Sequence, residues 1–428
     1  MSNLLDIMNE DSPLQPTSDS SKQSLWFLAS VMIGCTICVP IFVMGASMAH
    51  TLPFHEFVPA VLLGGLLVAA IAAATGVVGQ RTGLPTAMLA KIAFGSRGYI
   101  LANTAMAVNA IGWFGIQTTV FSNAFVELVH QLSGISLPLT PVMVMAGLIM
   151  SSTAIIGFRG LGKLSYIAVP LLLVMLFLPL WVAYTNGSLA TVADKVVTGT
   201  TSFGIIIAAV AGAYSFAATM PDVTRFMRTG KATVAGIGAN FVLAYPLLLI
   251  LTGTVALAAG QSDYIQIMMG LGYGVLAVAV LFLATWTTND TNVYAGSLSV
   301  NLFLPQFHRW QIATGVGVVG TIFSVLGIFD HFMSWLILSG NLFSPMAGVY
   351  VADYWLNRKR YAGTAEIPAF RLPQLCAWLI GLAVGQMTTG TDNMGFGMLT
   401  LTGVPMIDAM LAAALVQLVL HYTWDKED

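Results

Sequence analysis

Three side chains suited to stacking and hydrogen bonding recur at helical spacing between Leu101 and Val129. Asn109, Trp113 and Gln117 follow one another at intervals of four residues, so a helix places them on one stripe. An indole offers a planar heterocycle a face to stack on, and an amide offers its edge a donor and an acceptor. The stripe therefore predicts a binding site for a planar nitrogen heterocycle. The alternative is a tryptophan that packs helices and amides that bond between them.

A second polar patch interrupts the apolar segment from Leu271 to Val300. Thr287, Thr288 and Asn289 are consecutive there, at a depth where polar groups are costly. Hard alkali cations prefer oxygen ligands, so the two threonine hydroxyls predict an Na⁺ site that needs no carboxylate. The alternative is that both hydroxyls donate back to their own helix.

Two apolar segments combine glycine, hydroxyl residues and proline. One runs from Gly34 to Pro40 and the other from Ala211 to Pro221. Proline removes a backbone donor and glycine relaxes φ, and carbonyls freed at membrane depth are tolerated where they line a cavity or bind an ion. We expect breaks in the first and sixth helices, the spacing of two five-helix inverted repeats. The alternative is a simple kink in each packed helix.

The elements that position these residues are membrane helices. Hydrophobic residues make up 57% of the 428-residue chain and charged residues only 8%, against roughly 25% charged in soluble domains, which excludes a water-soluble globule. Helices of ~20 apolar residues cross a bilayer, and we expect an all-α polytopic membrane protein with twelve of them. The predicted segments are Leu25–Met48, Phe57–Gly79, Leu101–Val129, Val142–Phe158, Leu164–Tyr184, Phe203–Met220, Val234–Ala259, Leu271–Val300, Gln311–Ile328, Met333–Trp355, Leu375–Met387 and Val404–Leu420.

The charged residues predict the topology. All 16 lysines and arginines except Lys195 fall on one side of the twelve helices, and positively charged loops stay cytoplasmic, so both termini are expected in the cytoplasm. We expect a disordered tail at 1–24, a ten-helix transport core at 25–361, two peripheral helices at 362–421 and a second tail at 422–428.

Several classes of function lack their residues here. The net charge of −2 gives no reason to expect a nucleic-acid partner, and no GxxxxGK[ST] motif is present for ATP. An intramembrane enzyme would need a Ser/His, paired-Asp or His/Glu constellation at depth, and we find none. A pore would need a polar stripe through several helices, whereas polarity gathers at mid-depth on the first, third, sixth and eighth.

Short stretches spread along the chain resemble the nucleobase:cation symporter-1 family. They are Val31–Gly34, His55–Phe57, Gly112–Gly115, Asp222–Phe226, Trp286–Asp290, Ala352–Tyr354 and Asn357–Tyr361. The resemblance implies a leucine-transporter-like fold, with ten core helices in a 5+5 inverted repeat and two peripheral helices. It also implies coupling to Na⁺ or H⁺ and a substrate that is a purine, a pyrimidine, a hydantoin or a vitamin precursor.

The resemblance also implies site residues. A sodium site would take the backbone carbonyls of Gly34, Ile37 and Ala284 and the hydroxyls of Thr287 and Thr288. The substrate site would take Trp113 as the stacking partner, with Gly212, Ala213, Tyr214, Ser215 and Asn289 around it. With Asn109 and Gln117 from the stripe, these residues are the predicted substrate site.

Two positions depart from the family pattern. Members that transport cytosine have a glutamine where Ala110 stands, whereas Gln117 resembles the arrangement in the hydantoin branch. Ala213 stands in place of a second stacking aromatic, which leaves Tyr214 or Phe216 to replace it. We therefore expect Na⁺ symport of a nucleobase-like heterocycle by alternating access in a bacterial inner membrane, with H⁺ coupling as the alternative, and a best substrate other than cytosine.

Overall fold

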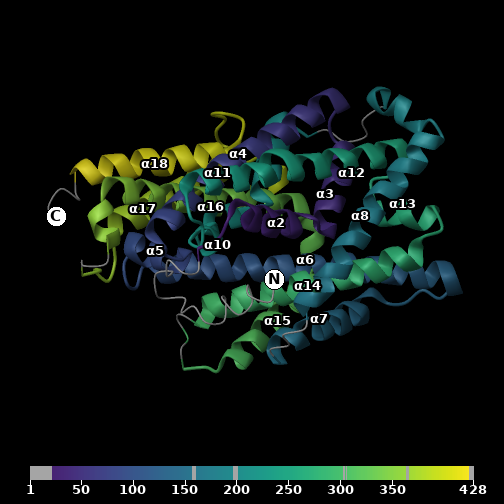
Figure 1. Ribbon diagram of the computed structural model, residues 1–428, viewed down its shortest axis with the longest axis horizontal. Coiled ribbons are helices and arrows are strands. Elements are labelled where there is room, and N and C mark those ends of the chain that lie inside the picture. Colours follow the sequence, from purple (N-terminus) through teal and green to yellow (C-terminus); the bar gives the residue numbers. More distant parts are fainter. Residues whose placement is uncertain are drawn as a thin grey trace.

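The computed structural model describes residues 22–156, 161–195, 201–301, 304, 306–362 and 366–423. Within these ranges every regular element is a helix, and one isolated bridge joins Gln23 to Met227 (Figure 1). Residues 1–21 and 424–428 of the two predicted tails, and Phe158 at the end of the fourth predicted segment, lie outside the described residues.

The helices overlap all twelve predicted apolar segments. Their bounds are α2 (Leu25–Thr36), α3 (Val39–Ala49), α4 (Phe54–Thr82), α5 (Thr86–Phe94), α6 (Tyr99–Ser133), α7 (Leu139–Ile156), α8 (Leu161–Thr185), η2 (Ser188–Asp194), α9 (Phe203–Gly212), η3 (Ser215–Thr219), α10 (Pro221–Thr224), α11 (Gly230–Gly238), η4 (Ala239–Ala244), α12 (Tyr245–Ala259), α13 (Tyr264–Gly270), α14 (Gly274–Asn301), α15 (Arg309–Val325), η5 (Ile328–His331), α16 (Phe332–Leu356), η6 (Arg358–Ala362), α17 (Leu372–Thr388), η7 (Thr391–Asn393) and α18 (Pro405–Thr423).

Length and hydropathy support fewer spans than the twelve predicted. Among the described residues, five helices are individually long and apolar enough to cross a membrane, or up to seven if each bent pair counts as one span. The count falls short because other apolar helices, such as α9 and α17, have fewer than 18 residues. The number of spans and the inverted repeat therefore stay predictions.

The first predicted break is present. Helix α2 ends at Thr36 and α3 begins at Val39, with a bend of 62° between them. The Cys38 N–H donates to the Thr36 carbonyl at 2.9 Å, which replaces the helical bond to Gly34. Pro40 lies in the first turn of α3, where its missing donor costs nothing.

The sixth predicted helix is also interrupted. Helix α9 ends at Gly212, and the chain leaves helical geometry at Tyr214, whose φ and ψ are −106° and 53°. The short 3₁₀ segment η3 follows, and Pro221 then begins α10. Both interruptions lie at the glycine and proline positions that the sequence singled out, so the prediction of two broken helices is confirmed.

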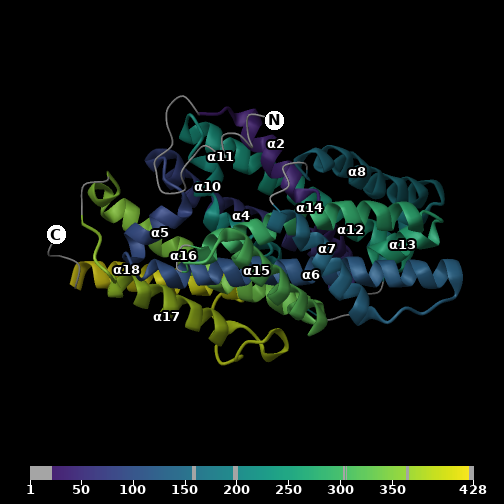
Figure 2. The same ribbon diagram turned by 90° about the horizontal axis from the view of Figure 1, so that it is seen from below.

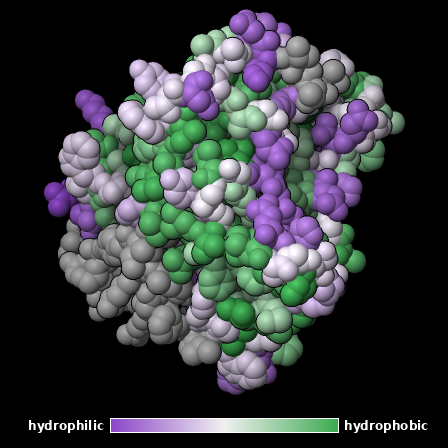
Figure 3. Space-filling model, turned by 90° about the vertical axis from the view of Figure 1, so that its right-hand side faces the viewer, coloured by the Kyte–Doolittle hydropathy of each residue, from purple (hydrophilic) through white to green (hydrophobic). Residues whose placement is uncertain are grey.

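Helix ends and loops that carry the basic residues contact one another at one end of the molecule. The Arg81 guanidinium lies 4.8 Å from the ring centroid of Trp355, and the Arg97 N–H donates to the Ala369 carbonyl at 2.7 Å. Lys22 donates to the Arg225 carbonyl at 2.9 Å. Helix α5, which the sequence did not predict, lies at this end in both ribbon views (Figures 1 and 2). Figure 3 views the opposite end, where α8 and α13 lie and hydrophilic residues stand beside hydrophobic ones.

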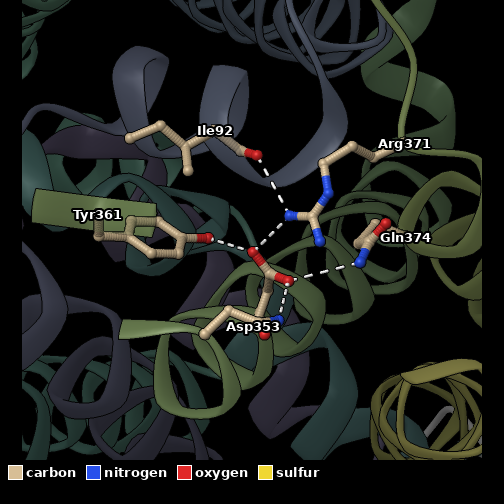
Figure 4. A network of polar contacts seen from close by, with 6 residues as sticks. Ile92, Asp353, Tyr361, Arg371 and Gln374 are labelled. Carbon is tan, nitrogen blue, oxygen red and sulfur yellow. Dashed lines mark hydrogen bonds and ion pairs between the residues drawn. The ribbon is translucent and has the colours of Figure 1, made fainter. Parts of the chain in front are cut away.

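The buried carboxylate of Asp353 joins several segments at the end of the molecule where α5 lies (Figure 4). Asp353, fully buried in α16, accepts from Arg371 at 2.8 Å and from the Tyr361 phenol at 2.7 Å. Asn357 and Gln374 donate to its other oxygen at 3.0 and 3.4 Å. Burial, with the Asp353 carboxylate beside it, raises the pKa of Tyr361 well above its ordinary value, so the phenol keeps its proton.

Candidate functional site

Asn109 lies where α6, the sixth-helix break and α16 meet. Its amide nitrogen donates to the Ser215 hydroxyl in η3 at 2.9 Å, and its amide oxygen accepts from the Ser339 hydroxyl in α16 at 3.2 Å. Both ends of the amide are therefore used to hold three elements together. The structure brings Asn109 and Ser215, two predicted site residues, into direct contact.

Trp113 and Gln117, the other two residues of the stripe, make fewer polar contacts than Asn109 does. The half-buried Trp113 ring meets Phe332 of α16 edge-on, with ring centroids 6.1 Å apart. Gln117 is 2% exposed, and its amide oxygen has no hydrogen-bond partner among the described residues. Leaving a buried acceptor unpaired costs free energy, so this oxygen is suited to accept from a bound molecule.

Close backbone contact fixes the end of α9. A Cβ atom on Gly212 would lie 2.0 Å from the Leu336 carbonyl oxygen of α16, so only glycine allows the two helices to approach this closely. Ala213, at 8% exposure, follows at the C-cap of α9. These two residues position the break against α16.

Tyr214 connects the two broken helices. Its phenol donates to the Thr36 hydroxyl at 2.7 Å, and its ring meets Phe241 and Tyr245 edge-on at 4.9 and 4.6 Å. No ring contact joins Tyr214 to Trp113 in the described part of the chain. The sequence offered Tyr214 as a second stacking residue, and the structure uses its ring and hydroxyl for packing between α2, η4 and α12.

Asn289 is held on a different face of α6. Its amide nitrogen donates to the Phe114 carbonyl at 3.3 Å and to the Thr118 hydroxyl at 3.1 Å, and its oxygen accepts from Asn292 at 3.2 Å. Phe114 and Thr118 are one residue beyond Trp113 and Gln117, which is about 100° around the helix. The structure does not bring the Asn289 amide to the stripe.

Three of the five predicted sodium ligands gather on α14. The hydroxyls of Thr287 and Thr288 both donate to the Ala284 carbonyl, at 3.0 and 2.8 Å. This is the back-bonding that the sequence left open as the alternative, and it also places three oxygens within one turn. The donor set is all oxygen, which fits a hard cation.

The remaining two ligands lie at the first break. The helical donors for the carbonyls of Gly34 and Ile37 are directed elsewhere, because Cys38 N–H donates to Thr36 and Ile41 N–H donates to Cys38. Helix α3, which starts directly after the break, packs against α14. Both predicted carbonyls are thus released from the helix at the step between α2 and α3.

Sequence reasoning missed the part that α16 contributes to this site. Phe332 contacts Trp113, Ser339 contacts Asn109, and Trp335 lies between them against Gly112 of α6. The spacing of these three residues along α16 is itself helical. That spacing was a signal that could have identified them.

Comparison with known proteins identifies the family and the fold of the chain. A sequence profile for a family described as permease for cytosine/purines, uracil, thiamine, allantoin matches residues 16–411. The chain is 29% identical to the cytosine permease of Escherichia coli strain K12 over 410 residues, which covers 95% of this chain and 93% of that protein. The resemblance found in the short sequence stretches is thereby confirmed.

Two solved structures share the fold. One is the inward-facing conformation of Mhp1, with a TM-score of 0.79 at 20% identity over 96% of this chain and 94% of that chain. The other is Mhp1, a nucleobase-cation-symport-1 family transporter, in a closed conformation with bromovinylhydantoin bound, with a TM-score of 0.73 at 19% identity over 96% and 95%. The all-helical fold is therefore that of a leucine-transporter-like protein.

The matched profile covers nearly the whole sequence, and the proteins that it describes are permeases rather than enzymes. Apolar helices long enough to cross a bilayer recur along the described chain. The protein is thus a multi-pass membrane transporter for nucleobase-like compounds, and it belongs to the family of permeases for cytosine/purines, uracil, thiamine and allantoin.

Proposed function

We propose that the protein imports a planar nitrogen heterocycle by Na⁺ symport across a bacterial inner membrane. The candidates are a pyrimidine, a purine, a hydantoin or a thiamine-precursor pyrimidine. The observation that carries the proposal is the unpaired, buried amide oxygen of Gln117 one helical turn from the Trp113 ring. Together they supply a stacking face and an edge acceptor, which is what such a ring needs.

Each residue of the stripe has a separate role. Trp113 stacks on the substrate and Gln117 accepts from a ring N–H. Asn109 is a positioning residue, because both of its polar ends are engaged by Ser215 and Ser339. Through those two hydrogen bonds, Asn109 fixes the substrate-binding face of α6 relative to the broken sixth helix and to α16.

The sodium ion would be held by Ala284, Thr287 and Thr288 on α14 with the freed carbonyls of Gly34 and Ile37. The hydrogen bond from Tyr214 to Thr36 then links the sodium site to the substrate site. Thr36 lies between the two freed carbonyls in sequence, and Tyr214 lies in the sixth-helix break beside Ser215. An ion that orders the first break therefore favours the substrate-binding geometry of the sixth. Such coupling is reciprocal, so substrate raises Na⁺ affinity by the same factor.

The topology supports alternating access. The proposed ten-helix core, a 5+5 repeat with broken first and sixth helices, would allow one group of helices to rock against the other around a central site. Contacts between the helix ends and loops that carry the basic residues, at one end of the molecule, support a cytoplasmic position for that end and for both termini.

Sodium is favoured over protons by the chemistry of the cluster. Its donors are hydroxyl and carbonyl oxygens, and none of them titrates in the physiological range. Uptake of radiolabelled uracil, hydantoin and hypoxanthine into proteoliposomes tests this. We expect accumulation above equilibrium with an inward Na⁺ gradient and none with a pH gradient alone. The reverse would establish H⁺ coupling, and equilibration that neither gradient turns into accumulation would indicate a pore.

A single substitution tests the cluster. Thr288→Ala removes one predicted ligand, and we expect the Na⁺ concentration for half-maximal uptake to rise about tenfold or more. Thr291→Ala is the matched control, because that hydroxyl also bonds back to its helix, at 3.2 Å to Thr287, but is exposed. Unchanged Na⁺ dependence in Thr288→Ala would refute the assignment.

A further inference from the structure

Two glycines bring α16 against both sides of the candidate site. A Cβ atom on Gly112 of α6 would lie 2.1 Å from Cζ2 of Trp335. A Cβ atom on Gly212 of α9 would lie 2.0 Å from the carbonyl oxygen of the next residue, Leu336. Neither contact leaves room for a larger residue, so the Trp335 indole is packed directly on the helix that carries the stripe.

Trp335 lies between two contacts to the stripe. One turn before it, Phe332 meets the Trp113 ring at 6.1 Å between centroids. One turn after it, Ser339 donates to Asn109 at 3.2 Å. The indole therefore lies beside the proposed substrate site, where the ring of Tyr214 is engaged elsewhere by Phe241 and Tyr245.

The indole N–H of Trp335 is buried and has no hydrogen-bond partner in the described part of the chain. Other indoles of α14 and α17 are satisfied, since Trp286 donates to Thr153 at 3.0 Å and Trp378 donates to the Leu342 carbonyl at 2.9 Å. A buried donor without an acceptor is costly. Among the described residues around the stripe, Trp335 thus offers an unpaired buried donor and Gln117 an unpaired buried acceptor.

We infer that Trp335 is a specificity-determining residue, whose indole N–H donates to a ring carbonyl of the transported heterocycle while Gln117 accepts from a ring N–H. This inference rests on the proposed function and narrows it. Rings that carry both a carbonyl and an N–H satisfy both groups, as uracil, hydantoin and hypoxanthine do. A ring without a carbonyl leaves the indole N–H buried and unpaired, and is rejected for that reason.

The test compares carbonyl ligands with their thiocarbonyl analogues, because sulfur is a weak acceptor. Binding of uracil, hydantoin and hypoxanthine, and of the monothio forms of each, is measured with the purified full-length protein in Na⁺. Trp335→Phe keeps an aromatic ring and removes the donor. We expect this variant to lose about tenfold in affinity for the best carbonyl ligand, a typical effect of removing one hydrogen bond in a buried site, and to lose the preference over one thio analogue.

A matched control and a second readout keep a folding defect from imitating this result. Trp378→Phe removes an indole N–H that is bonded within the α16–α17 contact, and we expect it to leave the carbonyl preference unchanged. Isotope-edited infrared spectra of the bound ligand should show a carbonyl stretch at lower frequency in the wild type than in Trp335→Phe.

The outcomes separate the two proposals. Binding by the wild type with the same carbonyl preference and the same carbonyl stretch in Trp335→Phe overturns the inference and leaves the proposed function standing. If the wild type binds a purine or aminopyrimidine without a ring carbonyl but none of these three rings, the inference fails and the proposed function stands. If it neither binds nor transports any purine, pyrimidine or hydantoin, the proposed function fails and the inference fails with it.

Discussion

Replacing Asp353 by asparagine removes the charge at the centre of the network in Figure 4 with almost no change in shape. Arg371, 6% exposed, then keeps its charge in a buried position and loses an acceptor that lay at 2.8 Å. Breaking one side of a buried ion pair typically costs about 3–5 kcal/mol, because the remaining charge is uncompensated. We expect a loss of that size in the free energy of unfolding.

Replacing the other partner, in Arg371→Gln, should cost less free energy of unfolding. In Arg371→Gln the Asp353 carboxylate keeps the Tyr361 phenol at 2.7 Å and Asn357 at 3.0 Å as donors, so its charge stays solvated by hydrogen bonds. Since both variants lose the same pair, the double variant should be more stable than the sum of the two losses predicts, by about 0.5–3 kcal/mol.

Equilibrium unfolding of the purified protein in mixed micelles measures these differences. Asp392→Asn is the matched control, because Asp392 is exposed in η7, and it should change stability by less than about 0.5 kcal/mol. Strict additivity of Asp353→Asn and Arg371→Gln, or a loss below about 1 kcal/mol in Asp353→Asn, would refute the argument that this pair fastens α16 to α17 and α5.

Two further predictions concern the stripe on α6. Trp113→Ala should weaken binding by about 1–3 kcal/mol, by analogy with base–aromatic stacking, or roughly one to two decades in affinity; Trp181→Ala, whose ring is 64% exposed, is the control, and equal losses in the two variants would favour a packing role for Trp113. Gln117→Ala removes an oxygen that has no partner in the described chain, and it should weaken the binding only of ligands with an amide-like edge. Competition of uptake by cytosine, uracil, hydantoin and aminopyrimidines checks this: cytosine as the best competitor in the wild type, with the same ranking in Gln117→Ala, would contradict it.

The sequence by itself determined the features that depend on local periodicity. Apolar runs mark the helices because a membrane helix must bury its backbone polar groups within itself. Glycine and proline in the stretches from Gly34 to Pro40 and from Ala211 to Pro221 act on the backbone where they occur, so both breaks were predictable. The four-residue spacing of Asn109, Trp113 and Gln117 likewise determines that they share one face of α6.

The tertiary structure alone decided how these faces are used. Helical spacing does not tell which neighbour a face meets, so the turning of Asn289 toward Phe114 and Thr118 could not be predicted from its position. The hydroxyl and ring of Tyr214 are likewise engaged by α2, η4 and α12 only because those elements converge on this side chain.

Contacts between residues far apart in the sequence could not be predicted for the same physical reason. Arg371 and Asp353 are 18 residues apart across a loop, and Trp335 reaches the site because Gly112 has no side chain to exclude it. Such pairs depend on the distance and rotation between packed helices, which follow from the fit of side chains across the whole bundle. A single sequence states the chemistry of each helix face, and packing decides which of those faces form the site.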